Sequence, residues 1–189
     1  SQTNLDGLTI TGGEFNDNMV GINIRNDIGG TAADRDAAAT TLTNVVIDGA
    51  QINNNTYKGL YAEKLDNAII TNVEVINSGT LAYDTGDFYR GTQAGIDINL
   101  KWQSYSNIEI SDSTFTDSGR NYMQTPANTD LAGALMVKAR DDGATYTPFP
   151  ATLSGLTITG NTFTNTNTTT YKTELGIRLG ETNADNATI

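Results

Sequence analysis

A repeated spacing of apolar residues limits what this chain can fold into more than any other feature of its 189 residues. Five segments each close on an isoleucine that another apolar residue precedes by two positions. The closing isoleucines are Ile10, Ile47, Ile70, Ile110 and Ile158. The preceding residues are Leu8, Val45, Ala68, Ile108 and Leu156. A period of two places every second side chain on one face of a strand, whereas a helix needs steps of three and four, so the segments predict half-buried strands.

Further positions keep a fixed distance from the same isoleucines. Ten apolar or aromatic residues complete the units, one five positions before and one five positions after each closing isoleucine. These are Leu5, Leu42, Leu65, Tyr105 and Leu153 before it, and Phe15, Ile52, Val75, Phe115 and Phe163 after it. A strand opened by glycine follows in each unit, at 21–24, 59–62, 95–98 and 176–179, with an irregular member one residue longer at 133–137. We expect a sixth unit to begin at 187–189.

The spacing is constant within a unit but varies between units, which indicates a fixed cross-section with loops extruded at its corners. We expect an all-β fold, a right-handed parallel β-helix of about five coils with long corner loops. Residues 1–189 would form one β-helix segment, a fragment of a longer secreted protein. Successive coils would stack about 4.8 Å apart, the ordinary spacing of hydrogen-bonded strands.

Composition narrows the classes of function. The net charge of −11 disfavours a nucleic-acid partner, which calls for a basic surface. The chain lacks cysteine and histidine, which excludes thiol chemistry and a histidine-based triad or metal site. No apolar run approaches 18 residues, so we expect no membrane span. Richness in Asn, Thr, Asp and Gly is typical of secreted or surface proteins of bacteria, and we expect an extracellular location.

The connections between strands carry their own expectations. Loops 76–94, 116–132 and 164–175 leave the same corner of successive coils and should stack into a wall that contains aromatic residues. Residues 32–39 suit a single helical turn, and 138–152 form a further insertion. Asn residues in the turns should bond one coil to the next. The one tryptophan, Trp102, either packs at a corner or stacks on a sugar ring, and we favour packing.

Three pairs of acids lie in the loops. They are Asp34 with Asp36, Asp84 with Asp87, and Asp141 with Asp142. Clustered carboxylate oxygens are the ligands that calcium prefers, and these six residues are candidate metal ligands. The pairs match neither an EF-hand nor the Gly-Gly-x-Gly-x-Asp calcium repeat, and solvated acidic loops are the favoured alternative.

The coil pattern resembles the pectin-lyase-like β-helix superfamily, and it is most similar to the carboxyl-terminal half of a mannuronan epimerase catalytic module. The resemblance rests on residues 44–55, on 94–98 with 106–113, and on 135–143 leading to 156–163. It implies the β-helix fold and an acidic polysaccharide, such as a polyuronate, as partner. The family's catalytic motif contains a histidine that this chain lacks. Any catalysis would be polyuronate epimerisation or cleavage within a larger enzyme.

Basic residues are unevenly placed along the chain. The five first-strand segments contain no Lys or Arg, and nine of the eleven basic residues lie within seven positions of a glycine that opens the second strand. We therefore expect a cationic face that meets the carboxylates of a polyuronate, with tyrosines against its ring faces. The candidate binding residues are Arg25, Tyr61, Lys64, Tyr83, Tyr89, Arg90, Asp97, Asn99, Lys101, Arg120, Tyr122 and Arg178.

A structural function is the alternative that the sequence leaves open. A β-helix presents open strand edges at both ends of its stack, and these need a cap, a continuation or a neighbour. The chain would then be a stalk, an adhesin segment or a filament subunit without catalysis, with head-to-tail self-association through its coil ends.

Overall fold

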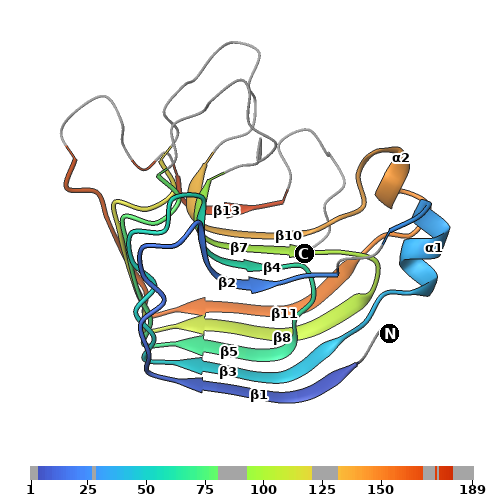
Figure 1. Ribbon diagram of the computed structural model, residues 1–189, viewed down its shortest axis with the longest axis horizontal. Helices are drawn as coiled ribbons and strands as arrows, with labels where there is room; N and C mark the ends of the chain where they lie inside the picture. Colours follow the sequence, from blue (N-terminus) through green and yellow to red (C-terminus); the bar gives the residue numbers. More distant parts are fainter. Residues whose placement is uncertain are drawn as a thin grey trace, which may run out of the picture.

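The computed structural model describes residues 4–26, 29–80, 93–120, 132–167, 173 and 175–180. Within these ranges the chain is mostly strand, and every pairing between its strands is parallel. The strands form three separate sheets, which we call A, B and C (Figure 1). The expected all-β class, built from parallel strands, is confirmed.

Sheet A has the order β1-β3-β5-β8-β11. Its strands are β1 (Leu5–Thr11), β3 (Leu42–Asp48), β5 (Asp66–Thr71), β8 (Ser104–Ser111) and β11 (Thr152–Thr159). Their register aligns the five closing isoleucines that the sequence singled out, since Ile10 pairs with Ile47, and Ile47 with Ile70, along the sheet. The pairing continues from Ile70 to Ile110 and from Ile110 to Ile158.

Sheet C has the order β13-β10-β7-β4-β2 and sheet B the order β12-β9-β6. The strands of sheet C are β2 (Val20–Ile24), β4 (Lys58–Ala62), β7 (Ala94–Leu100), β10 (Gly133–Ala139) and β13 (Leu175–Leu179). Those of sheet B are β6 (Glu74–Ile76), β9 (Thr114–Thr116) and β12 (Thr162–Thr164). Single bridges from Glu14 to Gln51 and from Gln51 to Glu74 extend the line of sheet B toward the first strands. The chain visits A, B and C in turn, and sheets A and C lie opposite one another (Figure 1).

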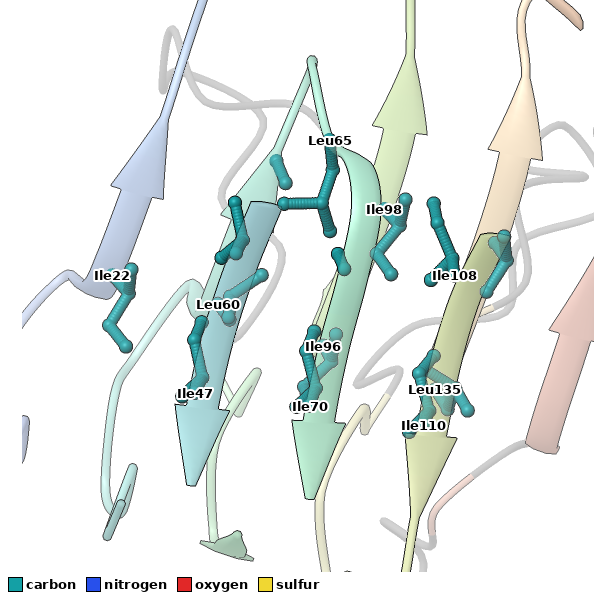
Figure 2. Close-up of a cluster of buried hydrophobic side chains, with 14 of the residues drawn as sticks. Ile22, Ile47, Leu60, Leu65, Ile70, Ile96, Ile98, Ile108, Ile110 and Leu135 are labelled. Carbon is teal, nitrogen blue, oxygen red and sulfur yellow. The ribbon is translucent and has the colours of Figure 1, made fainter. Parts of the chain in front are cut away.

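The core lies between the sheets and consists of columns of like residues. Ile47, Ile70 and Ile110 are fully buried, and Ile108 lies beside them in the neighbouring column (Figure 2). Leu60, Ile96 and Leu135 of sheet C belong to the same buried cluster. Each sheet gives its alternate side chains to this core, as the period of two predicted. The stacking that the sequence predicted for these columns is confirmed.

Asparagines and aspartates hold the turns between the sheets. Among the described residues, ten other than glycine have a positive φ, and six of these are asparagines. Asn67 Nδ2 donates to Asn44 Oδ1 at 2.5 Å, and Asn72 Nδ2 donates to Asp48 Oδ1 at 2.9 Å. Such side chains tolerate left-handed backbone and bond one strand connection to the next, as expected.

Two helices interrupt the strands. The first, α1 (Ala32–Ala37), begins with a capping box between Thr31 and Asp34, and it confirms the turn expected over residues 32–39. The second, α2 (Gly143–Tyr146), lies in the insertion after β10 and was not expected.

The strand register explains why the glycine strand at 133–137 is irregular. Gly133 pairs with Ala94, so Ala134 and not Gly133 lies opposite Gly95.

Candidate functional site

Basic side chains gather on one sheet. In the sequence, sheet C and the two positions after each of its strands hold seven Lys or Arg residues and four carboxylates. The strands of sheets A and B hold no Lys or Arg. The seven are Arg25, Lys58, Lys64, Lys101, Lys138, Arg140 and Arg178. Because Ile96 and Ile98 of β7 belong to the core, the alternate residues Asp97 and Asn99 lie on the other face of the sheet. That face is the candidate site.

A buried ion cluster lies at the middle of this face. Lys58 Nζ donates to Asp97 Oδ2, and Lys138 Nζ lies 3.7 Å from Asp97 Oδ1. Asp97 is fully buried, and the two lysines are 4% and 5% exposed. Lys58 Nζ also lies 4.7 Å from the centre of the Tyr61 ring, a cation–π contact.

The pKa values of this cluster follow from burial and charge. Burial acts to raise the pKa of the Asp97 carboxyl, but Lys138 and Lys58 outweigh it and hold that pKa below its ordinary value. Burial lowers the pKa of the Lys58 ammonium, and the charge of Asp97 opposes this shift. Asp97 is therefore ionised at neutral pH, and Lys58 releases its proton more readily than a solvated lysine.

A second cluster lies beside the first, around Glu63. Lys101 Nζ donates to Glu63 Oε1 at 2.5 Å, and Arg25 Nε lies 3.9 Å from the same oxygen. The Tyr61 hydroxyl donates to Glu63 Oε1 at 2.8 Å, and burial raises the pKa of this hydroxyl. The Arg25 side chain is 49% exposed, so this cluster reaches the surface.

Hydrogen bonding fixes the amide of Asn99. Its Nδ2 donates to the Tyr61 hydroxyl oxygen at 3.1 Å, which can only accept because its own proton goes to Glu63. Asn99 Oδ1 and Asp97 Oδ1 are buried and accept no hydrogen bond, although Asp97 Oδ1 is ion-paired with Lys138. These two buried acceptors lie two residues apart on the same face of β7. The face thus combines cations, which suit carboxylates, with acceptor oxygens, which suit hydroxyl groups. An acidic sugar carries both carboxylate and hydroxyl groups.

The structure brings together most of the described residues that the sequence proposed. Arg25, Tyr61, Asp97, Asn99 and Lys101 form the two clusters. Arg178 lies on the neighbouring strand β13, where it pairs in register with Met136. Lys64 follows Glu63 in the sequence, but its Nζ donates instead to Thr40 Oγ1 at 2.5 Å.

The remaining proposed residues are elsewhere. Arg120 follows β9 and joins neither cluster, since its side chain donates to Asn77 Oδ1 and to the Asp117 carbonyl. Tyr83, Tyr89, Arg90 and Tyr122 lie outside the described residues, as does most of the expected wall of loops. Four residues that were not among the candidate binding residues join the clusters: Tyr57, Lys58, Glu63 and Lys138.

The face also differs from the exposed cationic stripe that we expected. Asp97, Asn99 and Arg178 are buried, and so are Lys58 and Lys138. The physical reason is that acids alternate with the cations across neighbouring strands, so the side chains pair with one another and close over the sheet. Only Arg25 among the ion-paired cations of the two clusters is about half exposed.

One member of each described acid pair has another partner, whereas Asp141 Oδ1 is buried with no hydrogen-bond partner. Asp34 accepts from Thr31 in the helix cap, and Asp142 accepts from Arg140. Asp84 and Asp87 lie outside the described residues. Over residues 4–26, 29–80, 93–120, 132–167, 173 and 175–180, no group of three or more acidic side chains is placed to hold a metal ion. Calcium binding by Asp34, Asp36, Asp141 and Asp142 stays a prediction, and the described residues show no cluster of ligands that supports it.

Trp102 packs inside the protein, as favoured from the sequence. It is 5% exposed, and its ring centre lies 4.7 Å from that of Tyr146 in α2. The Arg140 guanidinium lies 4.5 Å from the centre of the Tyr146 ring, so α2 is held against the end of sheet C by a stack of three side chains.

Comparison of the chain with protein-family models, with curated proteins and with solved structures finds no match. Among the described residues, no helix has the length and apolar character needed to cross a membrane.

Proposed function

We propose that this chain is a segment of a right-handed parallel β-helix of the pectin-lyase-like superfamily, and that it binds an acidic polysaccharide such as a polyuronate. The binding surface is the face of sheet C that carries the two ion clusters. The fold is supported by the repeated order of the three parallel sheets along the chain. An extracellular location on or outside a bacterial cell suits both the Thr- and Asn-rich composition and this partner.

One observation carries the proposal, the segregation of the cations. A chain with a net charge of −11 places seven of its basic residues on one sheet or within two positions after its strands, with four carboxylates among them. The field of the whole protein repels a polyanion, but a Debye length of about 8 Å at physiological salt screens charges on the far side. Local charge therefore governs binding at this face.

The described groups supply each contact that a uronate residue needs. Arg25 is about half exposed and suits the carboxylate, and Lys101, which is 15% exposed, lies on the same Glu63 oxygen. Tyr61 offers an amphipathic ring, and Asn99 Oδ1 and Asp97 Oδ1 suit hydroxyl groups once the sugar reaches the buried part of the face.

Calorimetric titration with alginate and pectate oligomers tests the proposal. We expect binding that weakens as salt increases, and no binding of an uncharged glucan of the same length. Arg25→Gln should weaken binding because it removes the most exposed cation of the face. Arg35→Gln is the matched control, since it makes the same change in charge on α1. Absence of binding at low salt, or equal effects of the two variants, would refute the proposal.

A structural segment is the second candidate. It is favoured by a buried ladder of small polar side chains in which Ser78 Oγ donates to the Ile52 carbonyl at 2.7 Å and Ser118 Oγ donates to the Val75 carbonyl at 3.0 Å. Such contacts tie each strand connection to the next and stiffen the stack. A chain that binds none of the oligomers but resists unfolding would support a stalk or adhesin segment.

A further inference from the structure

The two ends of the stacked sheets are built from nearly the same residues. The hexapeptide Gly-Leu-Thr-Ile-Thr-Gly occurs at 7–12 and again at 155–160. The first copy falls on β1 and the second on β11, the two edge strands of sheet A. Phe15 and Phe163 follow at the same distance from each copy. Each end thus presents the same apolar pattern in the same strand direction.

Apolar side chains are exposed at both ends. At the end formed by β1 and β2, Leu5 is 54% exposed. At the end formed by β11, β12 and β13, Leu179 is 55% and Ile177 42% exposed. Their register partners inside the stack are buried, since Leu135 and Val137 show no exposed surface. The end residues are exposed because their columns lack one neighbour.

A glycine at the second end indicates a missing neighbour. A Cβ at Gly21 would lie 2.7 Å from the Gly59 carbonyl oxygen, and one at Gly95 would lie 2.5 Å from that of Ala134. At these positions the next strand comes too close for a side chain. A Cβ at Gly176 would meet only Phe163, at 3.7 Å. Its neighbours in the structure therefore do not require glycine at 176, whereas a further strand beside β13 would.

We propose that a second copy of this chain supplies that strand, with the β1–β2 end of one molecule stacked on the β11–β13 end of the next. Leu8 and Ile10 of one copy would then extend the columns that end at Leu156 and Ile158 of the other. Edge strands commonly carry Lys or Pro to block such pairing, and neither β1 nor β11 contains either residue. The contact is heterologous and does not close, so it builds a linear series of molecules.

Strand direction selects this head-to-tail arrangement over a symmetric one. Every pairing between the described strands is parallel, and the first end of one copy placed on the second end of the next repeats that parallel pairing. Two first ends related by a twofold axis would not repeat it. The net charge of −11 opposes association over longer range, so added salt should strengthen it.

Sedimentation velocity of the whole chain over a wide range of concentrations tests the proposal. We expect a series of oligomers that grows with concentration and with salt. Leu5→Lys/Met19→Lys blocks the first end, and Ile177→Lys/Leu179→Lys blocks the second, at positions that are largely exposed and so cost little folding stability. Each variant alone should be a monomer, and an equal mixture of the two should stop at a dimer.

Ile69→Lys is the matched control, because Ile69 is 41% exposed on the outer face of sheet A, in the middle of the stack. This variant should associate as the unchanged chain does. Circular dichroism and melting temperature establish that every variant is folded. A chain that stays monomeric at high salt and high concentration overturns the proposal, whether the ends are covered by another part of the chain or by another partner. Dimers formed by one end-blocked variant alone would also overturn it, since they require a symmetric contact.

Discussion

Two neighbouring isoleucines offer the sharpest test of the strand register. Ile69 and Ile70 are adjacent on β5, but Ile70 is fully buried and Ile69 is 41% exposed. Changing Ile70 to Ala removes apolar volume from a column in which Ile47 and Ile110 lie on either side. At about 0.8 kcal/mol for each buried carbon the transfer alone costs about 2.4 kcal/mol. The cavity left behind brings the expected loss to about 3–4 kcal/mol.

The same change at Ile69 should cost far less. Water fills the space that Ile69→Ala leaves, and part of this side chain is already exposed, so we expect a loss of roughly 1 kcal/mol. Urea unfolding followed by the fluorescence of Trp102, the one tryptophan and a buried one, measures both variants in the same assay. A gap of about 2 kcal/mol or more supports the register. Equal losses, or a larger loss for Ile69→Ala, would mean that β5 is shifted by one residue and that our core is wrong.

Three further outcomes are expected. Gly59→Ala should destabilise the chain by about 1–3 kcal/mol, because its Cβ would strike the Gly95 carbonyl, whereas Gly176→Ala should stay within about 0.5 kcal/mol in dilute solution. Thermal melts of the pair test this, and a neutral Gly59→Ala would contradict the close stacking of sheet C. The lowered pKa of Asp97 means that its charged form adds stability above its ordinary value of 3.8 and that this stability is lost as pH falls below it. Urea midpoints at a series of pH values should therefore fall less steeply on acidification in Asp97→Asn than in the unchanged chain, and parallel curves would count against the ion cluster. Finally, Asn55→Ala should lower the free energy of unfolding by about 1–3 kcal/mol. The buried Asn55 side chain accepts from the Asn18 backbone N–H at 3.1 Å and donates to the Phe15 carbonyl at 2.8 Å. In equilibrium unfolding, a loss no larger than that of a surface change such as Asn23→Ala would contradict this role.

The sequence predicted the core well because its signal is local and repeated. Val45, Ala68 and Ile108 share a position relative to the closing isoleucines, and the structure pairs them in register. A period of two determines which face of a strand a residue occupies. A constant offset between units then determines which residues stack, with no need to know the length of the loops between them.

The same reasoning could not predict how deeply the candidate site is buried. Alternation places Asp97 and Asn99 on the face opposite the core, but it carries no information on what packs over that face. The contact of Lys58 with Asp97 was harder to predict. Alternation places Lys58 on the same face of β4 as the core residue Leu60, but its long side chain brings the ammonium group to Asp97. Helix α2 was missed because its short sequence has no apolar period, and its position depends on the contact between Tyr146 and Trp102.

The fold itself does not require the charges of the candidate site. Met136 pairs in register with Asp97 and is fully buried, so an apolar side chain fits the same row of sheet C. A buried ion pair is weak evidence for stability, because removing two charges from water costs as much as their attraction returns, and apolar residues of similar volume often serve as well. The cluster of Lys58, Asp97 and Lys138 therefore adds little folding stability that apolar side chains such as that of Met136 could not supply. Under our proposal, the cluster is present on this sheet because the sheet binds an acidic ligand, and not because the fold needs the charges.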